Sequence, residues 1–163
     1  MLTFQVTIAN RATLSGNMNS RIYLDTNNNP NDGCGPNCDG ADMVLDLLPG
    51  DIAYAPWGGT KWDFSVRSPE SLTFSYVSGV ATIKVKASEL NIPTAFNFWL
   101  YADSDYNDVN SSGRSAHIDY APDYNHGTWS YTSKVTAPVK PTTKAVPKCA
   151  KGQKSTAKKP CKK

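Results

Sequence analysis

Oxygen-bearing side chains are concentrated in one stretch of the sequence, residues 25–42, where they alternate with turn-forming Gly and Pro. Carboxylate and amide oxygens are the ligands that Ca²⁺ prefers, and one ion takes about six to eight of them. The sequence therefore predicts a loop ordered by calcium. The candidate ligands are Asp25, Asn27, Asn29, Asp32, Asp39 and Asp42.

This stretch does not match an EF-hand loop. The sixth position counted from Asp25 is Pro30 where an EF-hand has Gly, and no Glu stands at the twelfth. Asn, Asp, Gly and Pro are also the residues of any long turn, because they cap their own backbone and accept unusual dihedral angles. A turn without metal is therefore the alternative interpretation.

Four cysteines form two pairs that are close in sequence. Cys34 and Cys38 flank a Gly-Pro turn, so we expect a small disulfide-closed loop; Cys149 and Cys161 can close a second loop near the C-terminus. A structural zinc site would need four ligands, and the other two cysteines lie far away in the sequence. Cys34 and Cys38 are one residue too far apart for a Cys-x-x-Cys redox motif. Paired cysteines favour an oxidising compartment, although free thiols are the alternative.

Aromatic residues are the second group of candidates, because ring faces stack on sugar rings while neighbouring polar groups bind hydroxyls. Trp99 lies between apolar neighbours and is assigned to the core. A Trp packed under a sheet is the alternative for every member of the group. The candidate ligand-binding residues are Tyr54, Trp57, Trp62 and Trp129.

Catalysis and haem binding find little support. The chain has only two Glu residues, and no Ser or Cys stands in a nucleophile motif, so we expect a protein that is not an enzyme. Met18 or Met43 with His117 or His126 could ligate haem, but none lies in a matching motif, so no haem is expected. A second acidic loop, residues 103–110, can bind another cation, complete the site at 25–42 if the fold brings the two loops together, or form an ordinary polar turn.

The elements that must position these residues are short strands. Apolar and polar residues alternate in a series of segments separated by turn residues, which predicts an all-β antiparallel sandwich of jelly-roll or immunoglobulin-like topology. Residues 87–90 predict the one short helical turn. The predicted strands are 2–8, 21–24, 43–48, 52–54, 62–66, 72–76, 80–85 and 96–100.

Charge divides the 163 residues into two parts. Residues 1–133 hold seven basic and fourteen acidic groups, a net charge of −7, whereas residues 134–163 hold ten Lys and no acid. We expect a sandwich module followed by a disordered tail rich in Lys, Pro and Thr. The tail can contact polyanions, or it is a disordered end with no partner, and its charge is no evidence for specific nucleic-acid binding. No apolar run is long enough to span a bilayer, and we expect a monomer.

Two segments resemble the β-sandwich superfamily that contains DOMON domains and family-nine carbohydrate-binding modules. Tyr-Leu-Asp-Thr at 23–26, followed by the Asn-rich loop and Gly-Ala-Asp, resembles the strand and ion-binding loop of that superfamily. The run 83–90 leading into 96–103 resembles the strand, the Ser-x-Leu turn and the next core strand. The resemblance covers about residues 2–131 and implies a jelly-roll sandwich.

The resemblance also bears on the two ends of the chain. The superfamily usually has a further strand ahead of Leu2, and no signal peptide precedes this segment. We therefore expect that an export signal and a first strand are missing from the N-terminus, or that the start was assigned too far downstream. The basic tail resembles those of secreted proteins of Gram-positive bacteria.

These observations predict a secreted or cell-surface, non-catalytic binding module. We expect calcium and the Cys34–Cys38 disulfide to order the loop, and the aromatic loops to bind a polysaccharide or cell-wall glycan. The alternative is a structural or adhesion module of the cell surface that has no small-molecule ligand.

Overall fold

The structure is a computed structural model that describes residues 1–9, 11–14, 16, 18–92, 94–109, 115–123 and 127–132. For residues 37, 104–109 and 115–117 it describes the backbone alone. The predictions for the tail at 134–163, for Cys149 and Cys161 and for the haem ligands His117 and His126 lie outside the described residues or side chains. Residues 103–109, predicted as part of an acidic loop, are instead the end of strand β7 (Ala95–Val109), and the side chains of 104–109 are outside the described part. No helix in the described ranges is long and apolar enough to cross a membrane.

Three antiparallel strands form the smaller sheet, in the order β1 (Leu2–Thr7), β6 (Val80–Val85) and β5 (Thr73–Val77). Ser78 and Gly79 connect β5 to β6, both with positive φ, 49° and 84°. Positive φ at both central residues matches the right-handed twist of paired strands. Ser78 and Gly79 therefore form a tight hairpin turn.

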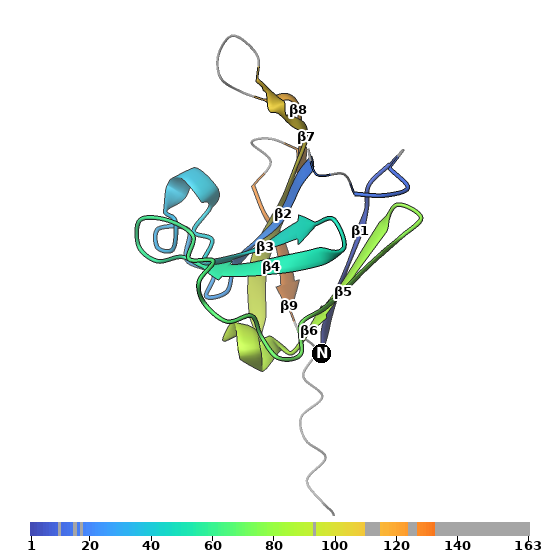
Figure 1. Ribbon diagram of the computed structural model, residues 1–163. Helices are drawn as coiled ribbons and strands as arrows, with labels where there is room; N and C mark the ends of the chain where they lie inside the picture. The colour runs from blue at the N-terminus through green and yellow to red at the C-terminus, as the bar shows by residue number, and fades with distance from the viewer. Residues whose placement is uncertain are drawn as a thin grey trace, which may run out of the picture. The chain divides into compact units, whose positions relative to one another are not determined.

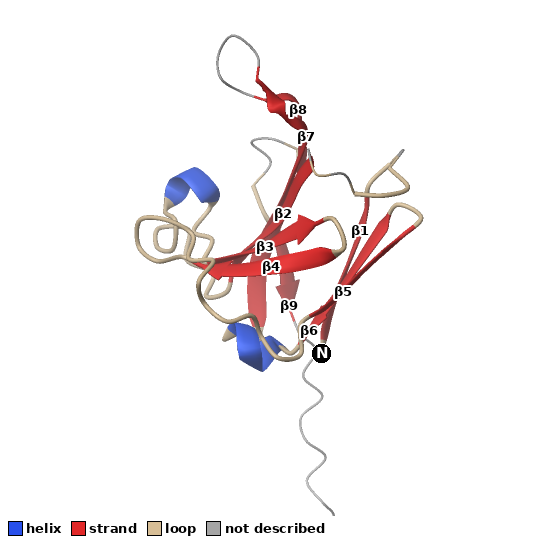
Figure 2. Ribbon diagram, viewed as in Figure 1, coloured by secondary structure: helices blue, strands red, loops and turns tan. Residues whose placement is uncertain are grey.

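The larger sheet has six strands, all paired antiparallel, in the order β4-β3-β2-β7-β8, with β9 also paired to β7 (Figures 1 and 2). β8 and β9 pair with successive parts of the long β7. Figure 1 shows β1, β5 and β6 on one side of the molecule and β2, β3, β4 and β7 on the other. The bounds are β2 (Met18–Asp25), β3 (Met43–Leu48), β4 (Asp51–Pro56), β7 (Ala95–Val109), β8 (Ser115–Ala121) and β9 (Trp129–Thr132).

The main core lies between the two sheets, because every second side chain of each strand points inward. Ile22 and Leu24 of β2, Leu45 of β3 and Ile83 of β6 are almost fully buried there. Leu90, at the end of the 3₁₀ helix η2 (Ala87–Leu90), adds to this core. The predicted antiparallel sandwich and the helical turn are confirmed.

The strand predicted at 62–66 is absent. Asp63 accepts hydrogen bonds from the backbone N–H of Ser65 at 3.0 Å and from its hydroxyl, so the chain turns instead of extending. Phe64 and Val66, whose alternation suggested a strand, are exposed. Only Trp62 keeps a strand-like contact, an isolated bridge to Trp57.

Candidate functional site

The loop at 25–42 joins β2 to β3 and is closed by internal hydrogen bonds. Asp25 is buried, and its Oδ1 accepts the backbone N–H of Asn29 at 3.1 Å. Its Oδ2 accepts the amide of Asn97, on β7, at 3.1 Å. Both oxygens of this predicted calcium ligand therefore already have donors within the protein.

Asp32 is where the predicted ligands converge. The side-chain amides of Asn27 and Asn29 both donate to its Oδ2, at 3.0 and 2.9 Å. Its other oxygen, Oδ1, is buried and has no partner in the described part of the chain. The structure thus brings Asp25, Asn27, Asn29 and Asp32 into one hydrogen-bonded group.

The remaining two predicted ligands lie apart from this group. Asp42 accepts the backbone N–H and the hydroxyl of Thr26, at 2.9 and 2.8 Å. Asp39 is exposed and ends the 3₁₀ helix η1 (Pro36–Cys38) in a left-handed conformation. The described residues contain no group of three or more His, Cys, Asp or Glu placed to hold a metal ion.

The loop also packs against the larger sheet. Cys34 is joined to Cys38 by a disulfide, as the sequence predicts. Cys34 and Ala41 contact a second apolar cluster with Tyr23 of β2 and Val44 of β3. These two strand residues alternate with core residues, so the cluster lies on the face turned away from the smaller sheet, which we call the outer face. The loop therefore borders the outer face.

Six aromatic rings lie in series on this face, and we call them the aromatic strip. Tyr23 stacks on Trp99 of β7, with centroids 3.9 Å apart and planes 4° from parallel. Trp62 meets Tyr23 edge-on at 5.7 Å, and Trp57 meets Trp62 edge-on at 5.0 Å. The strip consists of Trp57, Trp62, Tyr23, Trp99, Tyr120 and Tyr101, the last two 5.5 Å apart.

Charged groups lie beside the strip. Arg21 of β2 donates to Asp46 of β3 at 3.1 Å, and the hydroxyl of Tyr101 donates to Asp103 at 2.9 Å. Burial raises the pKa of Tyr101, and the hydrogen bond to Asp103 raises it further, so the phenol stays a neutral donor at physiological pH.

Several buried polar atoms on the outer face have no hydrogen-bond partner among the described residues. Such atoms are costly in a protein interior and call for an explanation. Strand alternation and pairing place all four of their residues on this face. The atoms are Arg21 Nε, Asp46 Oδ1, Trp99 Nε1 and Asp103 Oδ1.

The structure separates the four ligand-binding residues predicted from the sequence. Trp57 and Trp62 lie together in the aromatic strip. Tyr54 packs against the main core, where burial raises its pKa, and Trp129 of β9 contacts Phe98 on the inner side. The four residues therefore do not form one surface.

Trp99, predicted in the core, packs against the second apolar cluster and not against the main core. Phe98 and Leu100, its neighbours in β7, pack against the main core, so the side chain between them points to the outer face. Sequence reasoning also missed Tyr23, Tyr101 and Tyr120. The signal was present for Tyr23 and Tyr101, because each alternates with apolar residues that face inward, whereas Tyr120 stands between Asp119 and Ala121.

Comparison of the chain with models of known protein families, with curated proteins and with solved structures gives no match. The structure supports a predominantly β protein with two antiparallel sheets.

Proposed function

We propose that this protein is a non-catalytic carbohydrate-binding module whose ligand lies on the aromatic strip. The observation that carries the proposal is the combination, on one sheet face, of six rings in series with four buried polar atoms that have no described partner. A polyhydroxylated ligand suits this surface, because its C–H faces pack on aromatic rings while its hydroxyls both donate and accept hydrogen bonds.

We propose a secreted or cell-surface setting for this protein. The disulfide between Cys34 and Cys38 is typical of oxidising compartments. A polysaccharide or cell-wall glycan is the proposed ligand, and the ten Lys of residues 134–163 are proposed to contact surface polyanions. We also propose that the chain belongs to the superfamily that contains DOMON domains and family-nine carbohydrate-binding modules.

The second candidate function is a structural or adhesion module without a small-molecule ligand. The rings of the strip contact one another, so they also contribute to packing. The two functions differ in what the partly exposed rings of Trp57 and Trp62 do. In a binding strip these rings contribute mainly to ligand affinity, whereas in a structural strip they contribute mainly to the stability of the fold.

The distinguishing experiment is a polysaccharide and glycan array probed with the wild type, Trp62→Ala and Trp129→Ala. We expect the wild type to bind at least one glycan class and Trp62→Ala to lose about tenfold or more in affinity, since a stacked aromatic anchor contributes strongly to a binding site. Trp129→Ala removes the same side chain from the inner side and should bind normally. Absence of binding to every glycan, or equal losses in both variants, would support the structural module instead.

We also propose that Ca²⁺ stabilises the loop through Asp32. Its Oδ1 is buried without a described partner, and rotation of the Asn27 and Asn29 amides would turn their oxygens toward an ion beside it. An ion bound only by the folded state raises the melting temperature.

Thermal melts in millimolar CaCl₂ and in chelator test this. We expect a higher midpoint with calcium for the wild type and for Asp39→Asn, and no calcium effect for Asp32→Asn. The same wild-type midpoint in both solutions would leave the loop as a turn held by its own hydrogen bonds.

A further inference from the structure

The sandwich has one closed side and one open side. On the closed side, β4 of the larger sheet contacts β5 of the smaller sheet. On the other side, the smaller sheet ends at β1, which pairs only with β6 within the described ranges. The larger sheet extends past this edge with β7, β8 and β9, so part of its inner face has no strand opposite it.

The pairing of β1 with β6 determines which of its backbone groups lie on the open edge. Ile8 donates its N–H to Gly79 at 2.8 Å, which places the N–H and C=O of Ile8 on the side of β6. In an antiparallel strand these groups alternate from side to side with each residue. The N–H and C=O groups of Thr3, Gln5 and Thr7 therefore point away from β6, along the open edge.

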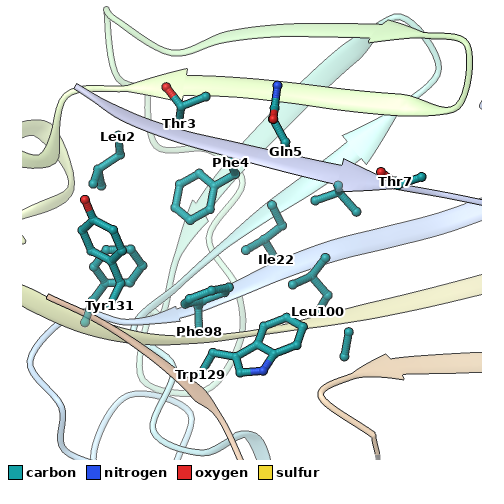
Figure 3. Close-up of a pocket in the computed structure, with 13 residues that line it drawn as sticks. Leu2, Thr3, Phe4, Gln5, Thr7, Ile22, Phe98, Leu100, Trp129 and Tyr131 are labelled. Atoms are coloured by element: carbon teal, nitrogen blue, oxygen red, sulfur yellow. The ribbon is translucent and has the colours of Figure 1, made fainter. Parts of the chain in front are cut away.

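A hollow of about 430 Å³ lies beside this edge. Phe4 points from β1 toward Ile22 and Phe98, whereas Thr3 and Gln5 point away from the hollow (Figure 3). Leu100 and Trp129 complete its apolar wall, and Trp129 is 44% exposed. None of the described residues that line it is charged.

The hollow continues along β1. A second one of about 560 Å³ shares Val6, Thr7 and Leu100 with the first and extends to Met18 at the start of β2. Together they form a groove with an unpaired strand edge as its upper rim. Its floor on the larger sheet is apolar in the first hollow and includes Asp103 and Asp119 in the second. We call it the β1 groove.

The geometry points to a β-strand of a partner polypeptide as the occupant of the β1 groove: an extended segment with an apolar side chain at every second position. Such a strand pairs with the backbone of Thr3, Gln5 and Thr7 and places its apolar side chains over Phe98 and Leu100. A small apolar molecule would fill the hollow but leave those backbone groups unpaired.

The sequence of β1 is consistent with strand addition. Exposed edge strands are usually protected from pairing by charged residues, Pro or a bulge. Residues 2–10 contain no charged residue and no Pro, and β1 pairs with β6 without a bulge in its register. This edge therefore carries none of the features that would repel a neutral strand. The wall of the first hollow is uncharged, whereas Arg11, Asp103 and Asp119 line the second.

The test uses the full chain and a fluorescein-labelled synthetic peptide, Lys-Thr-Val-Thr-Leu-Thr-Val-Thr-Lys, in a fluorescence anisotropy titration. We expect saturable binding that Gln5→Pro weakens about tenfold or more, because Pro removes an N–H from the open edge without removing one bonded to β6. Gln5→Val keeps this N–H and should bind like the wild type. Thermal melts verify that both variants are folded.

Two further peptides separate strand pairing from apolar capture, one N-methylated at each Thr and one at each apolar residue. The N–H groups of a bound strand alternate between its two sides, so either those of the Thr residues or those of the apolar residues face β1. One methylated peptide should therefore bind and the other should not. In the complex, hydrogen exchange should slow at the amides of Thr3, Gln5 and Thr7. The inference is overturned by absence of binding, by equal binding of both methylated peptides, or by a dimer of this chain that Gln5→Pro dissociates and the peptide cannot displace.

Discussion

Two glycines determine how tightly the loop at 25–42 closes. A Cβ built on Gly40 would lie 2.2 Å from the carbonyl oxygen of Asn29, and one built on Gly33 would lie 2.3 Å from that of Ala41. Both glycines also have positive φ, a backbone conformation that residues with a Cβ adopt only at a cost in free energy. The loop that borders the outer face therefore depends on residues without a side chain.

We predict that Gly40→Ala lowers the free energy of unfolding by about 3 kcal/mol, because backbone strain and a steric clash add to each other. Gly50→Ala is the matched control: its φ is +78°, but nothing lies within 4 Å of its Cβ, so it should lose only about 1 kcal/mol. Urea denaturation of both variants measures the difference. Equal losses would show that the close approach of the loop contributes nothing.

At the scale of elements, η2 is tied to the segment before β5 by one carboxylate. Glu89 accepts the backbone N–H of Ser71 at 3.0 Å and its hydroxyl at 2.9 Å. The same hydroxyl accepts the N–H of Lys86 at 2.8 Å. The backbone N–H of Ser71 is the main reason that the pKa of Glu89 lies below its ordinary value of 4.5, and the hydroxyl contributes.

A lowered carboxyl pKa stabilises the fold above the unfolded-state value and ceases to do so as pH falls through the folded-state value. We therefore predict that Glu89→Gln lowers the melting temperature at about pH 7 and that its difference from the wild type disappears below the lowered pKa of Glu89. Glu70→Gln, which removes an exposed ion pair with Arg67, should have little effect at either pH. A constant difference for Glu89→Gln across this range would contradict the account.

Most strands could be predicted from alternation, but one predicted strand is absent and two strands, β8 and β9, were not predicted. Residues 62–66 alternate like a strand, yet Asp63 turns the chain through its hydrogen bonds to Ser65. β9 has only four residues, all exposed, although Trp129 and Tyr131 contact Phe98 and Phe96 on the inner side; so short a segment does not show its pairing with β7. β8 carries Asp119 and Tyr120 beside small residues, and its place at the sheet edge depends on long-range pairing with β7.

At the scale of the whole molecule, the aromatic site depends on which face each strand turns outward. The sequence identifies Trp57 and Trp62 as candidates, but it does not show that Tyr23 and Trp99 join them. That conclusion needs the register of β2 against β7, which pairs Tyr23 with Trp99. The β1 groove depends on the number of strands in each sheet, a property that no local pattern contains.

The sandwich thus presents two surfaces for different ligands. The aromatic strip lies on the outer face and is proposed to bind carbohydrate, whereas the β1 groove lies on the inner face and is inferred to accept a strand. Trp57, Trp62 and Trp99 belong to the first surface and Trp129 to the second. The four tryptophans of the chain therefore report separately on the two surfaces.

The most direct test of the proposed function is an NMR titration that follows the four indole N–H signals while the best glycan from the array is added as a soluble oligosaccharide. The account predicts that the signals of Trp57, Trp62 and Trp99 shift in a saturable manner and that the signal of Trp129 stays in place. A shift confined to Trp129, or saturated binding that leaves the three strip signals unchanged, would contradict the assignment of the aromatic strip as the carbohydrate site.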